Sequence, residues 1–504
     1  MNATDRQVTV VGAGITGLCT ALALAKEGLN VTIIERDAPP PAGGADSAFF
    51  EWNRRGAAQF RHPHAFLAVM CNLLKDSFPG LVDDFFAAGA RKVTFEDMLP
   101  DDLKDKYVPE PGDEKMWLLL CRRATMETVF RRYAERQPGV TIRCNTHVNA
   151  LLSHRQDDQI VVDGLTIQEK GSEPEDLRCD VLIDAGGRNS KLKAWLKAEG
   201  AEITTEDDDA EIVYFTRHYK LRPGVEEPER ARGRDRSSGD LGYIKYGVFP
   251  GDSGHFAVIV CLHNDEVELR EAVKSSDQFD LICRSIPGLL PWLAEEKAEA
   301  TTSSFGFGDI HAVWHHFVND DKPAALNYFA VGDAAVRTNP LYGRGCSTGI
   351  IHAHVLASVL TEESDPLARA LRFHQETEEE LRPIFKASLS EDRKGIRRAR
   401  AEIAGEVIDR PDSLRAWFRA SFGDALSMAT TRDVRVLRGA MKTFNLMEKP
   451  GEFLKDWRIL ATTLGYMLRG RKRNAGSRKV NGPSRQEMLD IVARARAPDQ
   501  DEAA

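Results

Sequence analysis

The sequence predicts an α/β fold with an α+β insert, and three features carry that prediction. A β-branched run over residues 7–11 leads into a glycine-rich turn and then an alanine- and leucine-rich helical pattern. A second glycine-rich strand-to-helix turn occupies residues 332–349, far along the 504-residue chain. Strand signals dominate much of the stretch between them, and the pattern after residue 355 is helical. Strands that alternate with helices are typical of α/β proteins.

The first turn is a dinucleotide-binding motif of the form G-x-G-x-x-G, made by Gly12, Gly14 and Gly17. Gly12 allows the tight turn, Gly14 lets the backbone approach a pyrophosphate, and Gly17 lets the helix pack on the strand. The helix that follows presents free N–H groups and about half a positive charge to phosphates. Glu35 ends the next strand, where an acid accepts hydrogen bonds from ribose hydroxyls and disfavours a 2′-phosphate. The nucleotide is therefore FAD or NAD, and Arg36 is a further expected contact.

The second turn favours FAD over NAD. Residues 328–331 predict a buried strand, and Asp333 follows at its carboxyl end, where ligands bind in open α/β sheets. Two helix N-termini then converge on one ligand: the first suits a pyrophosphate, and the second suits a ring that becomes anionic on reduction. Asp333 holds ribityl or ribose hydroxyls between them. The expected ring-side contacts are Pro340, Gly343, Gly345, Cys346 and Ser347.

Composition excludes several classes of protein. The net charge of −9 argues against general nucleic-acid affinity. The eight cysteines form no C-x-x-C pair, which indicates buried thiols in a reducing compartment. We expect no signal peptide and no transmembrane helix, hence a cytoplasmic location. No second G-x-G-x-x-G motif precedes a helix and an acid, so a separate nicotinamide domain is not expected.

The predicted organisation is a discontinuous Rossmann-like FAD-binding domain, a β-rich substrate-binding domain and a helical C-terminal region with a disordered tail. The FAD-binding domain comprises residues 1–75, 115–205 and 322–360, the substrate-binding domain 76–114 and 206–321, and the helical region 361–504. Insert strands are expected at 213–221, 242–249 and 255–263, with a strand pair at 302–314. The run TEDDDAE, 205–211, is expected to be a solvated acidic link. Ser484 and Glu487 predict a capping box.

The motifs together resemble the FAD-dependent monooxygenase superfamily with the p-hydroxybenzoate-hydroxylase-like fold. The match rests on Gly12–Gly17 with Glu35, on DVLIDAGGRNS at 180–190 and on the second turn, and it covers about residues 5–360. It implies that Arg123, in RATME, contacts FAD and that Val148 offers the adenine a backbone contact. Gly186 replaces the aspartate of the aromatic hydroxylases, while Asp184 stands two positions earlier. This departure is more similar to polyketide and squalene-type epoxidases, flavin halogenases and geranylgeranyl reductases, and it leaves the route of flavin reduction open.

A loop at residues 56–67, GAAQFRHPHAFL, is similar to the G-x-x-Q-x-x-H-x-H-x-x-L loop of the polyketide-epoxidase-like group. It makes His62 and His64 candidates to approach the flavin edge, and plain loop structure is the alternative. These histidines flank Pro63, but no metal site is predicted. Arg337 and Tyr246 are the remaining catalytic candidates, from the ring-side loop and from the insert that covers the substrate.

The resemblance implies hydroxylation or epoxidation of a moderately apolar small molecule, of the kind found in secondary metabolism. O2 and NADH or NADPH, or a separate flavin reductase, would support a flavin C4a-hydroperoxide. The alternatives are a flavin-dependent reductase, dehydrogenase or halogenase, and a redox-neutral flavin-binding protein. The halogenase motif W-x-W-x-I-P is absent, which argues against halogenation. The basic run 469–479 suits an anionic lipid surface, a partner or a solvated loop. Substrate identity and oligomeric state are not specified.

Overall fold

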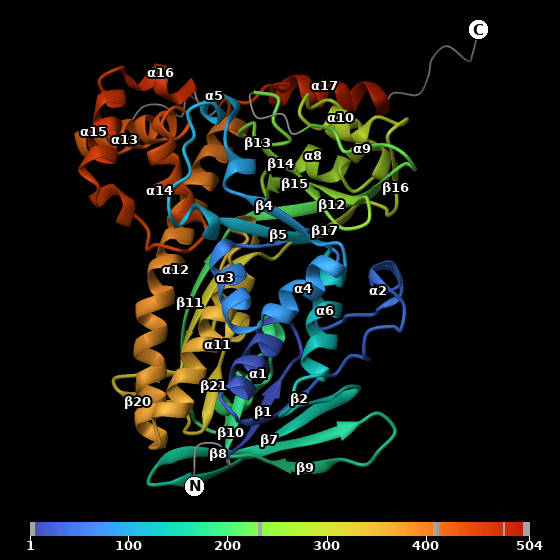
Figure 1. The fold of residues 1–504 in the computed structure, drawn as a ribbon, viewed down its shortest axis with the longest axis vertical. Coiled ribbons are helices and arrows are strands. Elements are labelled where there is room, and N and C mark those ends of the chain that lie inside the picture. The colour runs from blue at the N-terminus through green and yellow to red at the C-terminus, as the bar shows by residue number, and fades with distance from the viewer. Residues whose placement is uncertain (1–5, 230–233, 407–410, 412, 477–478, 497–504) are drawn as a thin grey trace.

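The structure is a computed structural model that describes residues 6–229, 234–406, 411, 413–476 and 479–496 (Figure 1). The expected disordered tail lies largely outside these residues. The predicted α/β class with a Rossmann-like parallel sheet and added antiparallel sheets is confirmed. The domain limits given above remain a prediction.

A five-stranded parallel sheet forms the centre of the lower body in Figure 1. Its strand order is β21–β10–β1–β2–β6, and every neighbouring pair is parallel. The strands are β1 (Gln7–Val11), β2 (Asn30–Ile34), β6 (Val140–Arg143), β10 (Val181–Asp184) and β21 (Tyr328–Ala330). Chain segments far apart in the sequence therefore meet in one sheet, and their carboxyl ends form one edge.

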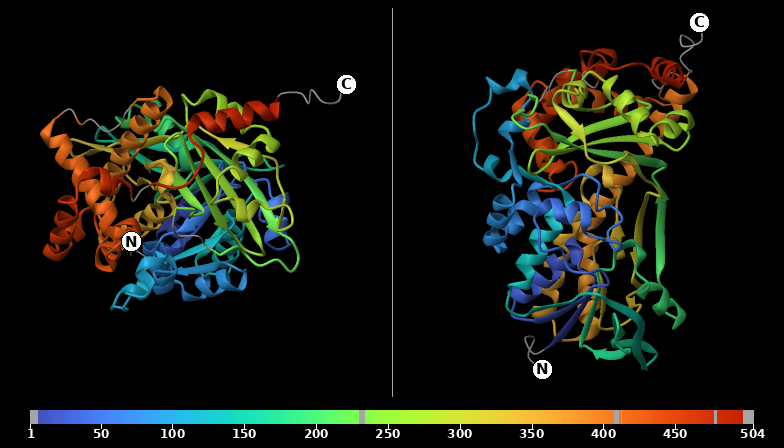
Figure 2. Two further views of the ribbon diagram at one scale, coloured as in Figure 1. Left: turned by 90° about the horizontal axis from the view of Figure 1, so that it is seen from above. Right: turned by 90° about the vertical axis from the view of Figure 1, so that its right-hand side faces the viewer.

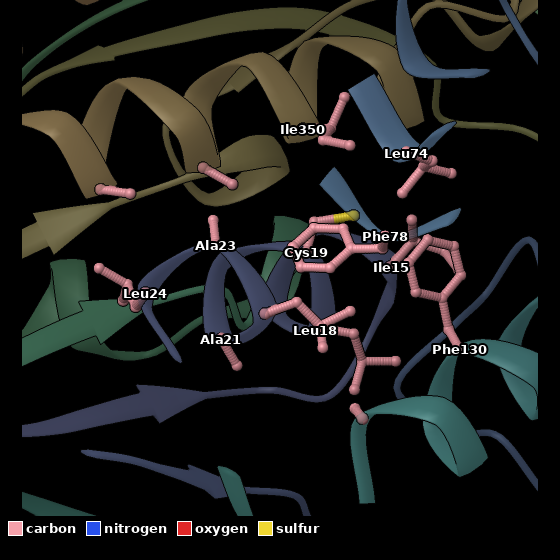
Figure 3. Packing of buried hydrophobic residues seen from close by; sticks show 14 of the residues in the cluster. Ile15, Leu18, Cys19, Ala21, Ala23, Leu24, Leu74, Phe78, Phe130 and Ile350 are labelled. Atoms are coloured by element: carbon pink, nitrogen blue, oxygen red, sulfur yellow. The ribbon is translucent and has the colours of Figure 1, made fainter. Parts of the chain in front are cut away.

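Helix α1 (Ile15–Lys26) lies at the core of this body, with nine of its residues buried. Figure 3 shows Ile15 and Cys19 of α1 near Leu74 of α3 (Ala68–Ser77) and Ile350 of α11 (Gly345–Glu362). Phe130 comes from α6 (Arg123–Glu135), which packs against the same helix. Since α1 is enclosed by other helices and the sheet, its apolar composition is explained.

Shorter sheets and helices surround the parallel sheet or extend from it. The sheet of β7 (Thr146–Gln156), β8 (Gln159–Glu169) and β9 (Glu175–Arg178) lies at the bottom of Figure 1, and another joins β3 (His64–Phe66), β5 (Trp117–Cys121) and β4 (Arg91–Thr94). β19 (Val318–Asn319) pairs with β20 (Lys322–Pro323). The remaining helices are α2 (Ala45–Glu51), α4 (Pro79–Ala87), α5 (Asp101–Lys104) and α7 (Leu192–Ala198).

A six-stranded antiparallel sheet lies above the parallel sheet (Figures 1 and 2). It contains β13 (Ser238–Asp240), β14 (Ile244–Pro250), β15 (His255–His263), β12 (Ile212–Leu221), β16 (Ala298–Ala300) and β17 (Phe305–Phe307). One face packs on α8 (Val267–Ala272), α9 (Ser276–Arg284), α10 (Leu290–Leu293) and α17 (Arg485–Arg496). The predicted strands near 213–221, 242–249 and 255–263 are therefore present. The Ser484–Glu487 capping box is also confirmed, since the Ser484 N–H and hydroxyl both donate to the Glu487 carboxylate at 2.8 Å.

Two expectations for this region were wrong. Residues 302–314 do not form a strand pair: β17 pairs with β12, whereas β18 (His311–His316) pairs with β11 (Thr204–Asp209) and β22 (Val336–Arg337). The acidic run is β11 and not a link. Its carboxylates meet cations, because Asp207 contacts His311 at 2.6 Å and Asp208 contacts Arg393 at 2.8 Å.

The C-terminal region is helical, as predicted. Its helices are α12 (Pro366–Ala404), α13 (Leu414–Thr430), α14 (Val434–Phe444), α15 (Trp457–Met467) and α16 (Arg471–Ala475). Helix α12 runs beside both bodies, and α13 to α16 gather at the upper left of Figure 1. Within the described residues, no helix combines the length and hydropathy needed to span a bilayer.

Candidate cofactor and active site

The glycine turn after β1 leaves the first turn of α1 open. A Cβ on Gly12, whose φ is +100°, would lie 2.6 Å from the Ala185 carbonyl oxygen, and one on Gly17 would lie 1.9 Å from the Gly12 carbonyl oxygen. Gly14 differs, since its Cβ would meet no atom within 4 Å. Gly14 is also the N-cap of α1, without a side-chain cap and without an acid in the first turn. Free N–H groups therefore border open space.

The start of α11 lies against the start of α1. A Cβ on Gly349 would lie 2.3 Å from Thr16 Oγ1, and one on Gly332 would lie 2.7 Å from the same atom. Gly343, at φ +65°, and Gly345 both face open space, and the first turn of α11 also lacks an acid. The two helix N-termini thus converge, as the sequence predicted.

Asp333 lies beside this junction among three arginines. Burial raises the pKa of its carboxyl, whereas the charges of Arg337, Arg123 and Arg188 lower it. Within the described part of the chain its side chain has no hydrogen-bond partner. A carboxylate with free acceptors at this point suits ribityl or ribose hydroxyls, and that role remains a prediction.

The third glycine-rich turn follows β10. It shows the role of Asp184, which stands two positions before the Gly186 that replaces the aspartate of the aromatic hydroxylases. Asp184 accepts hydrogen bonds from the Gly186 N–H at 2.9 Å, the Ser190 hydroxyl at 2.6 Å and the Tyr328 hydroxyl at 2.9 Å. Burial raises the pKa of this carboxyl. Asp184 therefore holds the turn in place, and it does not reach outward as a ligand contact.

Glu35 lies at the expected strand end, but its carboxylate is only 3% exposed. It accepts hydrogen bonds from the N–H groups of Ala13 and Asp37, both at 2.9 Å, and lies 3.1 Å from Arg54. Glu35 thus ties the glycine turn to the end of β2. Its contact with a ribose remains a prediction.

Arg54 is the residue that sequence reasoning missed. Its guanidinium lies 2.9 Å from Asp37 and 2.8 Å from Glu127, besides Glu35. Glu127 in turn bonds Arg123 at 2.8 Å, and the two arginines hold the pKa of Glu127 down at about 2 although burial opposes this. Arginine is common in loops, so no local pattern could have singled Arg54 out.

Arg123 connects this network to α11. Its Nη1 lies 3.2 Å from the Cys346 sulfur in the first turn of that helix. The next residue, Ser347, is fully buried, yet its hydroxyl has no hydrogen-bond partner. A buried polar atom without a partner is costly. A ligand group at this helix start would satisfy it.

The space, charge and unpaired groups of this site can be compared with the shape and charge of FAD. Open space at Gly14 and Gly345, two uncapped helix N-termini without acids and the unpaired Ser347 hydroxyl match an extended ligand with a diphosphate at one end and an anionic ring at the other. The residues fit FAD. Pro340 opens the short helical turn of residues 340–342 that leads into α11.

Two predicted nucleotide contacts lie farther along this edge. Val148 is at a register shift in β7, two residues after Thr146, whose N–H donates to the Glu35 carbonyl. Arg36 is exposed and donates to the Arg55 carbonyl at 2.8 Å. Both are near the end of β2, and their contacts with FAD remain predictions.

The two loop histidines have different surroundings. His62 Nδ1 lies 2.8 Å from the Thr216 hydroxyl, and its ring packs 5.0 Å from Phe305 and 5.2 Å from Phe307. His64 Nδ1 donates to the His62 carbonyl at 2.8 Å, and its pKa responds to Arg123. His62 therefore contacts the upper sheet, whereas His64 lies toward the Arg123 network. Burial lowers the pKa of His62 to about 4 and that of His64 to about 3.

The structure does not bring Tyr246 to this group. On β12, the residues Tyr214, Thr216 and His218 contact the lower body, and Tyr246 belongs to the opposite face of the sheet. Its hydroxyl donates to the Arg236 carbonyl at 3.3 Å. Arg337, in contrast, lies near Asp333, and its Nε donates to the His311 carbonyl at 3.0 Å.

A small hollow of about 30 Å³, continuous with solvent, adjoins the loop that carries Pro340. Asn339 and Leu341 line it from the loop, Ile212 and Cys261 from the sheet, and Asp392 from α12. It lies between the sheet, the loop that precedes α11 and helix α12.

Among the described residues, Glu211, His263 and Asp265 are the only group with a spacing suited to a metal ion. Arg400 forms ion pairs with both carboxylates, so these acids already have a cation.

The buried histidines make stability sensitive to acid. His62 has a folded pKa of about 4, below the ordinary 6.5, so the unfolded chain takes up its proton first as the pH falls. Between pH 7 and pH 5 this one residue should cost about 2 kcal/mol of folding free energy. We expect His62→Gln to reduce the loss of stability over this range, measured by urea unfolding at both pH values. An unchanged difference would contradict the burial of His62.

The fold and the paired helix starts resemble those of FAD-dependent oxidoreductases. Residues 7–97 match the family model described as FAD dependent oxidoreductase. Proteins similar to this chain in sequence or in fold include a hydroxylase and several monooxygenases.

Three sequence relatives illustrate this. Protein Rv3254 of Mycobacterium tuberculosis is 28% identical and aligns over 70% of this chain and 72% of its own. Aklavinone 12-hydroxylase RdmE of Streptomyces purpurascens is 30% identical and aligns over 38% of this chain and 35% of its own. A kynurenine 3-monooxygenase of Xanthomonas campestris is 23% identical over 72% and 73%.

Solved structures show the same fold. The flavin-dependent brominase Bmp2 has a TM-score of 0.58 at 15% identity, covering 93% of this chain and 99% of its own. p-Nitrophenol 4-monooxygenase PnpA from Pseudomonas putida DLL-E4 has a TM-score of 0.57 at 18% identity, and the match covers 88% of this chain and 99% of PnpA. Diels-Alderase PyrE3 has a TM-score of 0.55 at 16% identity, and the match covers 88% of this chain and 81% of PyrE3. One fold thus serves several reactions, and the fold alone does not select among them.

Proposed function

We propose that this chain hydroxylates or epoxidises a moderately apolar small molecule with O2 and a reduced nicotinamide. Bound FAD supplies the chemistry that activates O2. The relatives named as a hydroxylase and as monooxygenases support oxygenation over the other reactions that this fold serves. The electrons come from NADH or NADPH directly, or through a separate flavin reductase.

The sheet face opposite the start of α11 is the observation that carries the proposal. Half-buried Phe305 and Phe307 pack against the buried His62, which lies 2.8 Å from buried Thr216, and give this face a largely apolar lining. Because its pKa is about 4, His62 is neutral at pH 7 and offers a hydrogen bond without a charge. Such a surface suits an apolar ring system with one or two polar groups.

The charges near Asp333 fit the same reaction. Burial raises the pKa of Asp333, Arg337 and Arg188 lie close enough to oppose this rise, and the start of α11 adds a positive helix end. Fixed positive groups of this kind stabilise negative charge that develops on a bound ring. The chain's own contribution is therefore to exclude water, orient the substrate and hold the ring.

The test uses the purified, FAD-loaded protein and candidate aromatic and polyketide-like substrates. We expect substrate-dependent O2 uptake, with NADPH, NADH or an added flavin reductase as electron source, and a product heavier by one oxygen atom. A product that differs by two hydrogens would indicate a reductase or dehydrogenase, and a gained halogen a halogenase. An isomer formed without O2 uptake would indicate a redox-neutral role. Each of these results would refute the proposal.

A further inference from the structure

Helix α15 presents an apolar stripe to solvent. Trp457, Leu460, Ala461, Leu464 and Leu468 recur at helical spacing, the last just past the helix end, and all are exposed. Trp457 is 71% exposed and Leu468 is 91% exposed. Ile459 and Thr463, on the opposite side, are buried. A surface helix normally places polar residues outward, so this stripe is inverted.

A second apolar group lies on α13, which packs against α15 at the upper left of Figure 1. Leu414 is 87% exposed, Trp417 47% and Phe418 52%. Phe418 stacks on Phe422 one turn later. Clustered exposed apolar residues of this size mark an interaction surface.

Cations outnumber acids along the two stripes, which Asp456 and Asp424 adjoin; Asp424 pairs with Arg471 at 3.0 Å. Residues 457–476 contain five arginines and lysines and no acid, and residues 414–423 contain two arginines and no acid. The chain as a whole is acidic at −9. The guanidinium of Arg458 lies 5.7 Å from the Trp457 ring, and that of Arg469 lies 4.3 Å from the Tyr466 ring. Two of these cations therefore lie beside aromatic rings.

We propose that α13 and α15 dock this protein on the surface of an anionic lipid bilayer. Exposed tryptophans and leucines beside arginines and lysines are the composition of helices that lie in a membrane interface. Anionic headgroups attract basic residues, and the apolar stripe enters the boundary of the acyl chains. A second copy fits less well, because a two-fold interface would place the same cations against each other.

The test measures co-sedimentation of the full-length FAD-loaded protein with vesicles of phosphatidylcholine alone and with about one third phosphatidylserine. We expect binding to the acidic vesicles that weakens at high salt. The double variant Leu464→Glu/Leu468→Glu should bind about tenfold or more weakly, because it removes two leucines that would be buried in the bilayer. The matched control, Val267→Glu/Leu290→Glu, changes exposed residues of α8 and α10 and should bind like the wild type.

Circular dichroism and retained FAD confirm that both variants fold. Failure of the wild type to bind acidic vesicles would overturn the proposal, as would equal binding by the stripe variant. A wild-type dimer that the stripe variant converts to a monomer, without vesicle binding, would assign the surface to a second copy. Retention of an acidic polypeptide but not of vesicles would assign it to a protein partner.

Discussion

Gly14→Val should abolish stable FAD binding while the fold persists. A Cβ at this position would have no protein atom within 4 Å, so the substitution begins without a clash in the protein. It would, however, occupy the space beside the uncapped N–H groups of α1, where we propose that the diphosphate binds. Loss of two charge-assisted hydrogen bonds weakens binding by about 100-fold or more. Visible absorbance per mole of protein and titration of the apoprotein with FAD measure the effect.

Gly44 provides a matched control for this substitution. It is the N-cap of α2, its backbone is extended at φ −80° and ψ −160°, and its Cβ would also meet no atom within 4 Å. Gly14 has φ −74° and ψ 178°. Gly44→Val should therefore retain FAD with an unchanged melting temperature. Equal flavin content in the two variants would show that the pyrophosphate does not lie against Gly14.

The glycine-rich turns explain why so much of the fold was predictable. Gly12, Gly17 and Gly349 each face an atom less than 3 Å from where a Cβ would stand, so local sequence reports long-range packing there. The convergence of α1 and α11 followed from two such turns without any knowledge of the contacts. The helical C-terminal region could also be predicted from local sequence, because its residues follow a helical periodicity.

The errors arose where distant charges decide the structure. β11 is a strand because its acids find His311 and Arg393, which lie far along the chain. Arg54 likewise bonds Glu127, 73 positions away. Tyr246 shows a different limit: it lies on a true strand, but which face of β14 packs on the core depends on the neighbouring strands.

Arg54→Met should produce the largest loss of stability among single substitutions in this network. The change removes a guanidinium that lies within 3.1 Å of three buried carboxylates, those of Glu35, Asp37 and Glu127. Methionine fills much of the volume, but the acids lose their shared cation. Breaking a buried ion pair from one side costs about 3–5 kcal/mol. Urea unfolding at pH 7, compared with the wild type, measures this free-energy difference.

The difference in unfolding free energy between the wild type and Arg54→Met should depend on pH if it arises from lost charge, and not if it arises from lost packing. The folded pKa of Glu127 is about 2, so its pairing stabilises the fold fully above the ordinary 4.5 and loses this effect as the pH falls toward 2. The gap between wild type and Arg54→Met should therefore narrow as the pH falls from 7 to 4, because the unpaired acids of the variant take up protons. The exposed neighbour gives the control, and Arg55→Met should change stability by less than about 0.5 kcal/mol. A gap that stays constant with pH would mean that Arg54 acts by packing alone, and the charge network would then not hold the glycine turn in place.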